Sequence, residues 1–326
     1  MASSEGTVFR PAASWWQRLP INSVFRKLIL TATYNRFVAR LVRKYGMRLG
    51  AGRFVAGETL DEAIAVLRRL NQQGMRANTT LLGEGVRDEA TATAVVAEYM
   101  KVLDRIAEEK LTVNVALKLT HLGLDLGEEV ASRNVERLVV HAAELGNFVR
   151  IDMEESARVD PTLRIYKRLR AAGHDNVGTV LQSYLYRTPD DLADLLPLKP
   201  NLRLVKGAYL EPASIAYPDK VDVDRAYVEL AERMLREAAF TAIATHDDRI
   251  IEHVIGFADR NGIGKDRFEF QMLYGIRTQS QRALVARGYR VLVATPYGPE
   301  WYFYLMRRLA ERPANVLFFA KNLIKR

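Results

Sequence analysis

Residues 112–153 read TVNVALKLTHLGLDLGEEVASRNVERLVVHAAELGNFVRIDM, and this stretch indicates how the rest of the chain folds. Two short runs rich in apolar residues, 112–118 and 148–153, flank a longer run, 128–145, whose apolar residues recur at helical spacing. A strand, a helix and a second strand in this order are typical of parallel strands joined by a covering helix.

The same alternation continues along the chain. Runs with the character of strands occur at residues 78–84, 112–118, 148–153, 177–183, 202–207, 241–246, 267–271 and 289–294. Helical patterns occur at residues 89–106, 128–145, 161–172, 222–238, 249–261, 278–287 and 300–311. This alternation predicts an α/β fold, a (β/α)8 TIM-like barrel whose mouth is closed by the last helix. A doubly wound open sheet is the alternative, but the GxGxxG turn of its dinucleotide-binding form is absent after the first strand.

The charge is concentrated at the start of the chain. The 326 residues carry a net charge of +9, and residues 1–57 hold ten basic residues and one acid, which accounts for all of it. A neutral remainder argues against a protein that binds nucleic acid over its surface. We therefore expect a basic helical arm at residues 1–75, followed by a catalytic barrel at residues 76–326.

Residues 21–45 of this arm mix apolar residues with arginines. A basic amphipathic helix can lie on an anionic membrane surface, but we favour a helix packed on the barrel or on a partner subunit. The arm lacks the features of a signal peptide, whereas its arginine content keeps a transit peptide as an alternative. No run is apolar for the roughly 18 residues that a spanning helix needs. We expect a cytoplasmic protein, with peripheral contact at the inner face of the cell membrane as a further candidate.

Polar residues stand near the ends of most predicted strands, where a buried strand should be apolar. They are Glu84, Lys118, Asp152, Gln182, Lys206, Thr245, His246 and Gln271. The carboxyl ends of the parallel strands meet at one face of a barrel, which is its catalytic face. We therefore expect these side chains to surround one site.

Two adjacent arginines, Arg307 and Arg308, lie in the last predicted helix. Guanidinium groups bind carboxylates and phosphates in a bidentate manner, although a solvated helix end is the alternative. Lys118 and Asp152 offer a buried ion pair at the barrel mouth. His246 suits a general base, a phosphate donor or a core histidine. The residues alone predict a barrel enzyme for an anionic ligand.

Other chemistries remain open at this level. Lys118 or Lys206 could form a Schiff base in an aldolase. A third interpretation is non-enzymatic: a barrel that only binds amino acids, or a membrane-associated scaffold built on the basic arm. A thiolate site is excluded because the chain has no cysteine. The five histidines show no paired spacing, so we expect no metal site.

Seven stretches make a family resemblance visible. In chain order they are Leu117-Lys-Leu-Thr-His-Leu-Gly-Leu124, Arg150-Ile-Asp-Met-Glu-Glu-Ser156, Val180-Leu-Gln-Ser-Tyr-Leu185, Arg203-Leu-Val-Lys-Gly-Ala-Tyr209, Ala244-Thr-His-Asp247, Phe268-Glu-Phe-Gln-Met-Leu-Tyr-Gly275 and Tyr304-Leu-Met-Arg-Arg-Leu-Ala-Glu311. Together they closely resemble the proline dehydrogenase family, in its short monofunctional bacterial form.

The resemblance implies an FAD-dependent barrel enzyme. Such enzymes oxidise L-proline to 1-pyrroline-5-carboxylate, the first step of proline catabolism to glutamate, by hydride transfer to the flavin. They then pass electrons to a quinone. The resemblance also implies that Arg307, Arg308 and Lys118 bind the proline carboxylate and that Asp152 holds these cations. Glu84 would close the site by pairing with Arg307.

Further site residues follow from the same resemblance. Tyr209, Leu273 and Tyr304 would shape the pocket around the proline ring. Flavin contacts are implied for Met153, Gln182, Arg203, Lys206, Gly207, Ala208, Thr245, His246 and Glu311. Of these, Arg203 would lie near the flavin N5 edge and, with Asp152, would be catalytic.

One position departs from the family pattern. In Val293-Ala-Thr-Pro-Tyr-Gly298, Ala294 stands where family members often have tyrosine. A missing ring would widen the pocket, so we expect a relaxed preference that includes hydroxyproline.

Overall fold

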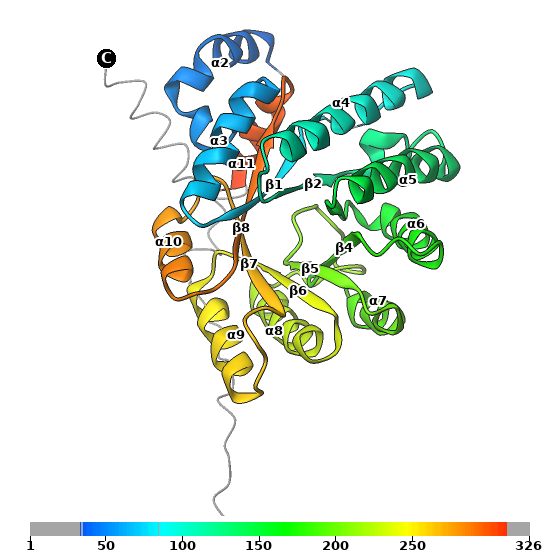
Figure 1. Cartoon of the computed structure of the whole chain (residues 1–326), viewed down its shortest axis with the longest axis vertical. Helices are drawn as coiled ribbons and strands as arrows, with labels where there is room; N and C mark the ends of the chain where they lie inside the picture. Colours follow the sequence, from blue (N-terminus) through cyan, green and yellow to red (C-terminus); the bar gives the residue numbers. More distant parts are fainter. Residues whose placement is uncertain (1–32, 34, 84, 312–326) are drawn as a thin grey trace, which may run out of the picture.

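The chain closes into a barrel of eight parallel strands. The computed structural model describes residue 33, residues 35–83 and residues 85–311. Each strand pairs with the next along the chain, and β1 (Arg76–Leu81) also pairs with β8 (Val291–Tyr297). Helices connect the strands on the outside of the barrel (Figure 1). This arrangement confirms the predicted (β/α)8 barrel.

The remaining bounds follow the predicted alternation closely. The other strands are β2 (Val113–Leu117), β3 (Val149–Ile151), β4 (Val177–Gln182), β5 (Asn201–Val205), β6 (Phe240–Ala244) and β7 (Phe268–Leu273). The α-helices are α2 (Arg36–Leu49), α3 (Leu60–Gln72), α4 (Glu89–Glu108), α5 (Glu128–Glu144), α6 (Val159–Ala171), α7 (Thr188–Leu195), α8 (Lys220–Glu237), α9 (Asp248–Arg260), α10 (Thr278–Ala286) and α11 (Trp301–Glu311). Short 3-10 turns include η2 (Ala51–Arg53) and η3 (Leu119–Leu122).

Two helices, α3 and α7, were not among the helical patterns singled out in the sequence. The start of α3 carries a local signal, because Thr59 and Glu62 form a capping box that satisfies free backbone N–H groups. The eight residues of α7 are too few to show a clear helical period. Since α3 contributes Ile64 and Leu67 to the main core cluster, it packs as part of the barrel, although the sequence analysis assigned it to the arm. The division at residue 75 stays a prediction.

Strand β8 extends three residues beyond its predicted end and includes Pro296. A proline usually marks the end of an interior strand, because it lacks the N–H that a ladder needs. Here Pro296 lies opposite Thr80 of β1, and its carbonyl accepts a hydrogen bond from Ala56 N at 2.8 Å. The segment before α3 therefore packs against the end of the last strand.

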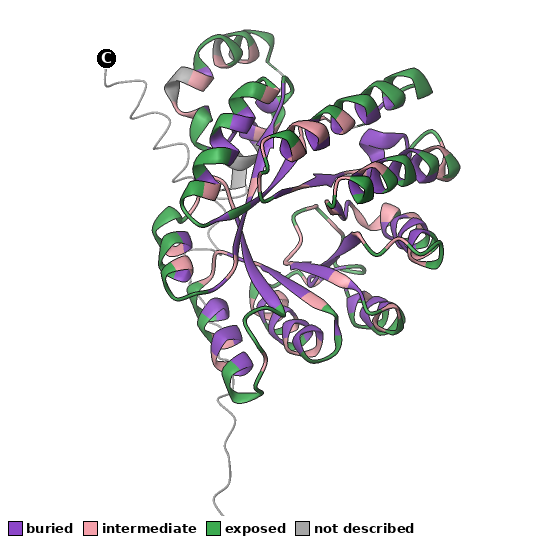
Figure 2. Cartoon of the chain, in the orientation of Figure 1, coloured by how far each residue is buried: buried purple, intermediate pink, exposed green. Residues whose placement is uncertain are grey.

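Burial follows the layers of the barrel. The strands are almost wholly buried, and the helices expose one face to solvent (Figure 2). The amphipathic helices bury their apolar faces against the outside of the strands. The interior of the barrel is more polar than the usual branched apolar layers. Arg150, Arg203, Glu269 and Gln271 are all buried.

Arg150 is held by hydrogen bonds to residues of β4 and β5. Its guanidinium donates to the carbonyls of Thr179 at 3.0 Å and Asn201 at 2.8 Å, and to Asn201 Oδ1 at 2.5 Å. Burial, with the nearby charge of Arg203, lowers the pKa of Arg150 to about 9. The hydrogen bonds satisfy the buried cation, as a stable interior requires.

Gly178 makes room for this guanidinium. A Cβ atom at Gly178 would lie 2.5 Å from the Asn201 carbonyl oxygen and would also collide with Arg150 Nη1. We expect Gly178→Ala to lower the free energy of unfolding by about 3 kcal/mol, because a backbone atom and a buried cation must both move. Urea unfolding measures the change. The matched control is Gly52→Ala, whose added methyl meets only ordinary contacts at 3.6 Å. Equal stability of the two variants would contradict the packing described here.

The last helix is held by the N-terminal segment. Trp301, Tyr302 and Leu305 of α11 form a second apolar cluster with Phe54 and Val55, apart from the main core. Leu82 and Ile276, from the loops after β1 and β7, pack against it, which places α11 at the carboxyl end of the barrel.

Polar contacts and α2 complete this attachment. Trp301 Nε1 donates to Glu58 Oε1 at 2.9 Å, and the Tyr302 hydroxyl donates to the Thr33 carbonyl at 2.9 Å. Helix α2 contacts α11, and a Cβ atom at Gly46 would lie 2.7 Å from the Trp301 ring. For the described part of the arm, this matches the favoured interpretation of a helix packed on the barrel. Within the residues described, no helix is both long and apolar enough to cross a membrane.

Candidate active site

Five of the predicted polar residues stand at the carboxyl end of their strands. Gln182 is the last residue of β4, while Lys118, Asp152, Lys206 and Thr245 directly follow β2, β3, β5 and β6. His246 comes next after Thr245. Because the barrel is closed and parallel, these residues share one face. The strand-end prediction is confirmed for this group.

The prediction that Gln271 ends its strand was wrong. Strand β7 continues to Leu273, so Gln271 lies two residues deeper, where its Nε2 donates to Glu269 Oε1 at 2.6 Å. The strand extends because Met272 and Leu273 continue the apolar run and pair with Val293 and Ala294 of β8. Strand β1 ends earlier than predicted, at Leu81.

Asp152 and Arg203 form a charge pair at the barrel mouth. Arg203 Nη1 donates to Asp152 Oδ1 at 2.7 Å, and the two side chains are 10% and 25% exposed. Charge-assisted hydrogen bonds of this length are among the strong ones. Arg203 Nε and Gln182 Oε1 are buried without a hydrogen-bond partner among the described residues. A buried donor and a buried acceptor of this kind are costly unless a ligand or water meets them.

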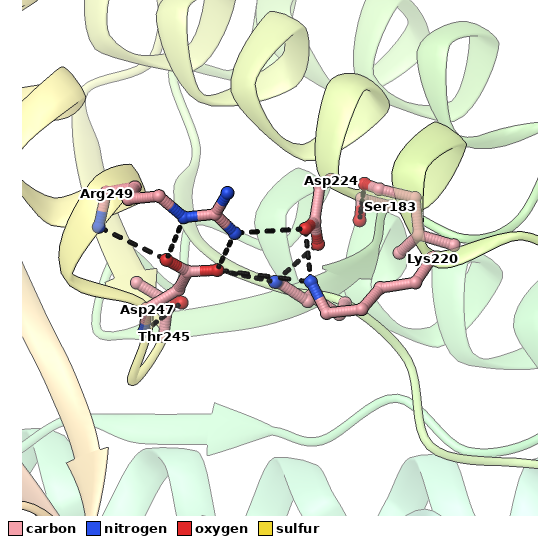
Figure 3. Close-up of polar contacts among 8 residues, drawn as sticks. Ser183, Lys220, Asp224, Thr245, Asp247 and Arg249 are labelled. Atoms are coloured by element: carbon pink, nitrogen blue, oxygen red, sulfur yellow. Dashed lines mark hydrogen bonds and ion pairs between the residues drawn. The ribbon is translucent and has the colours of Figure 1, made fainter. Parts of the chain in front are cut away.

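A second charged cluster lies at the carboxyl ends of β5 and β6 (Figure 3). Lys206 Nζ donates to Asp224 Oδ1 at 2.5 Å and lies 3.6 Å from Asp247 Oδ2. Lys220 pairs with Asp224, and Arg249 pairs with Asp247 at 3.2 Å. Burial lowers the pKa of Lys206 more than its hydrogen bond to Asp224 raises it. Burial raises the pKa of Asp247, but its hydrogen bonds from Arg249 and the charge of Lys206 outweigh this effect, and the pKa is lowered.

His246 connects two neighbouring strand ends. Its Nε2 accepts a hydrogen bond from the backbone N–H of Leu273 at 3.0 Å. Because an accepting imidazole nitrogen carries no proton, His246 is the tautomer with its proton on Nδ1. Leu273 in turn lies beside Ala294 in the β7–β8 register.

The other expected contact residues surround the same mouth. Met153 and Thr245 are buried, Tyr209 and Gly207 are half-buried, and Ala208 is exposed on the loop after β5. Gly207 has φ of 110°, which favours glycine, and a Cβ there would collide with the Tyr184 ring.

Comparison with known proteins decides the family. The family model described as proline dehydrogenase matches residues 63–321. The chain belongs to the proline dehydrogenase family. It is 44% identical over 309 residues to the proline dehydrogenase of Deinococcus radiodurans, covering 94% of this chain and 99% of that protein. It is 42% identical to proline dehydrogenase 1 of Bacillus subtilis, covering 93% of this chain and 100% of that protein.

A solved structure agrees with the fold. Proline utilization A (PutA) from Bdellovibrio bacteriovorus, inactivated by N-propargylglycine, superposes with a TM-score of 0.78 at 25% sequence identity. The match covers 88% of this chain and 36% of that protein. The present chain therefore matches one part of the longer PutA and the full length of the short proline dehydrogenases.

Four of the expected site residues lie wholly or partly outside the described part of the chain. The side chains of Arg307, Arg308 and Glu311 lie outside the described part of the chain, although their backbone continues α11. Glu84 lies outside it entirely. Tyr304 is half-buried on α11, and Lys118 is half-buried at the start of η3.

Besides Asp247 of the charged cluster, three acidic residues near the mouth were missed by the sequence analysis. Glu154 is buried and accepts hydrogen bonds from Thr120 N at 3.1 Å and Thr120 Oγ1 at 2.6 Å. Glu211 accepts from Ser156 N at 2.7 Å and Ser156 Oγ at 2.6 Å. These bonds tie together the loops after β2, β3 and β5. Glu154 belongs to the stretch from Arg150 to Ser156 that carries part of the family resemblance, so the sequence did offer a signal for it.

The third missed residue is Asp224, which is 1% exposed on α8. Nothing in the sequence distinguishes it from the other acids of this helix. Within the described ranges, no group of three His, Asp or Glu side chains is placed to hold a metal ion.

Proposed function

We propose that the chain oxidises L-proline to 1-pyrroline-5-carboxylate with FAD and passes the electrons to a quinone. The substrate follows from the names of relatives that match over almost their full length. The observation that supports the proposal most strongly is the Asp152–Arg203 pair, together with buried atoms of Arg203 and Gln182 that have no hydrogen-bond partner in the described part of the chain.

The residues at the mouth fit a flavin. A flavin ring has hydrogen-bond donors and acceptors along one edge, and Arg203 Nε and Gln182 Oε1 are a buried donor and acceptor without partners among the residues that the structure describes. When bound, FAD supplies the acceptor for hydride. The residues that would hold it are Met153, Gln182, Arg203, Lys206, Gly207, Ala208, Thr245, His246 and Glu311.

The substrate carboxylate would be bound by Arg307, Arg308 and Lys118. Matched cations offset the cost of moving a carboxylate out of water. Glu84 would close the site by pairing with Arg307, and Tyr209, Leu273 and Tyr304 would pack around the ring. Asp152 would orient the cationic side of the site and fix Arg203 at the flavin edge. Holding the ring carbon in place beside the flavin lowers the entropic part of the barrier.

Inactivation by N-propargylglycine tests the proposal. This compound inactivated the PutA protein of known structure, so it should also inactivate this chain with time when FAD is bound. L-Proline in excess should protect the enzyme by competing for the same site. A fully loaded protein that keeps its activity after prolonged exposure would argue against the proposed site.

Ala294 should relax the substrate preference. Its side chain is half-buried directly beside Leu273, and a tyrosine there would fill space next to the substrate ring. We expect Ala294→Tyr to lower the ratio of kcat/KM for hydroxyproline over proline about tenfold or more. The small control Ala294→Ser should leave this ratio within about twofold. If wild type and Ala294→Tyr have equal ratios of kcat/KM for hydroxyproline over proline, the proposed role of Ala294 is wrong.

The acceptor quinone suggests contact with a membrane surface through α2. Arg36, Arg40, Arg43 and Lys44 are exposed on this helix, and Phe37 is 73% exposed beside them. Basic side chains with an exposed ring suit an anionic lipid surface. Vesicles with anionic lipid should float the protein, and replacing Arg36, Arg40 and Lys44 by glutamine should reduce flotation. Unchanged flotation of this variant would reject contact through α2.

A further inference from the structure

Asp224 is the most deeply buried carboxylate of the charged cluster at the ends of β5 and β6. It is 1% exposed, and one of its oxygens contacts Lys206. The other contacts Lys220 (Figure 3). Arg249 Nη2 lies 4.0 Å from Asp224 Oδ2. A buried carboxylate is tolerated only when such cations surround it.

The cluster as a whole has a surplus of positive charge. Its cations are Lys206, Lys220 and Arg249, and its acids are Asp224 and Asp247, which leaves a net charge of +1. Lys220 and Arg249 are nearly half exposed, so they lie on the solvent side, while Lys206 is about a quarter exposed and directly follows β5. The pyrophosphate is the anionic part of FAD, and this surplus charge is complementary to it.

We propose that Asp224 is a positioning residue, which holds the Lys206 ammonium ready to bind the pyrophosphate of FAD. This inference rests on the proposed function, because it takes FAD as the cofactor. Lys206 has a flexible stem of four carbons, and Asp224 fixes its end with a 2.5 Å hydrogen bond. The carboxylate also keeps the ammonium charged, since burial alone favours the neutral amine.

Substitution of Asp224 sets two effects against each other. Asp224→Asn raises the net charge of the cluster, so attraction of an anion alone would tighten FAD binding. If positioning dominates, the loss of a charge-assisted hydrogen bond weakens FAD binding by about 10- to 100-fold. The direction of the change therefore separates the proposal from simple charge attraction.

The experiment is a fluorescence titration of apo-protein with FAD, and with riboflavin as a probe that lacks the pyrophosphate. We expect Asp224→Asn to raise the Kd for FAD about 10- to 100-fold and to leave the Kd for riboflavin within about twofold. The matched control is Asp222→Asn, the same substitution on the same helix, where the carboxylate pairs with exposed Arg225 at 3.1 Å. This control should bind FAD like the wild type.

A double substitution shows whether Asp224 acts through Lys206. In a Lys206→Met background, Asp224→Asn should have little further effect on the Kd for FAD, because interacting residues are not additive. Should Asp224→Asn fail to fold, the apolar pair Lys206→Met with Asp224→Leu replaces both charges, and it should bind FAD no worse than Lys206→Met.

The pH dependence of FAD binding gives an independent readout. Lys206 must be protonated to bind phosphate, so FAD affinity falls as pH rises through its pKa. Without the Asp224 carboxylate this pKa is lower, and the loss of affinity in Asp224→Asn should begin at a lower pH than in wild type. The other charged groups facing Lys206 are Lys220, Asp247 and Arg249, and the substitution leaves them in place.

The outcomes are distinguishable. FAD binding by Asp224→Asn that is unchanged or tighter overturns the inference, as does an equal loss of FAD affinity in the Lys206→Met background. Wild-type apo-protein that takes up no FAD would instead overturn the proposed function.

Discussion

Replacing Arg203 by methionine should lower kcat/KM for proline about 100- to 1,000-fold, the range found when one preorganised donor is removed from an active site. Arg203 is almost fully buried, donates to Asp152 at 2.7 Å, and its Nε has no hydrogen-bond partner within the described ranges. The substitution removes the donor proposed for the flavin edge and leaves the Asp152 carboxylate without this partner. Steady-state rates with a soluble dye as acceptor measure the effect, and FAD content corrects for lost cofactor.

The control for Arg203 is an exposed arginine–carboxylate pair on the outer helices. Arg164 donates to Glu128 at 2.7 Å on the outer helices, where its side chain is 59% exposed. Arg164→Met should leave kcat/KM unchanged and cost at most about 1 kcal/mol of stability. If Arg203→Met keeps wild-type turnover per bound flavin, the assignment of Arg203 to the reaction is wrong.

Truncating Trp301 to alanine should raise KM for proline about 100-fold or more. Trp301 is buried in the cluster that joins α11 to Phe54 and Val55, and removing a buried Trp side chain costs about 3–5 kcal/mol. Because this cluster lies apart from the main core, we expect the loss to displace α11 while the barrel stays folded. The proposed carboxylate ligands Arg307 and Arg308 are carried by this helix, so proline binding should weaken most.

Far-UV circular dichroism and kinetics together test this prediction. Phe303→Ala is the matched control, because it removes an aromatic ring from the same helix at a side chain that is 37% exposed. It should change KM less than about threefold. An unchanged KM in Trp301→Ala would show that α11 does not bring the arginines to the substrate. The N-terminal segment and α2 hold α11 in place, so deleting the arm would also disturb the site. Deletion of the arm is therefore a poor test of its contact with lipid.

The barrel could be predicted from the sequence because its signal is repeated. Each strand–helix unit shows apolar runs of the right length, and polar residues such as Lys118 and Asp152 interrupt them where the strands end. The elements that were predicted wrongly or missed have local causes. Helix α7 is short, and Pro296 continues β8 at a position where a proline usually ends a strand.

The partners within the site could be predicted less well. The sequence analysis did not name Arg203 as a partner of Asp152, and their hydrogen bond crosses the barrel interior from β5 to the end of β3. Contacts between strands that are not neighbours depend on barrel closure and tilt, which no local pattern records. Asp224 was missed for a similar reason, because the loop from β5 to α8 brings it to Lys206.

The visible spectrum of the protein, recorded without oxygen before and after L-proline is added, tests the central claim most directly. The account predicts a protein that carries FAD, whose flavin absorption is bleached by L-proline and returns when a quinone analogue is added. A protein fully loaded with FAD whose absorption is unaffected by L-proline, or one that cannot be loaded with FAD, would contradict it.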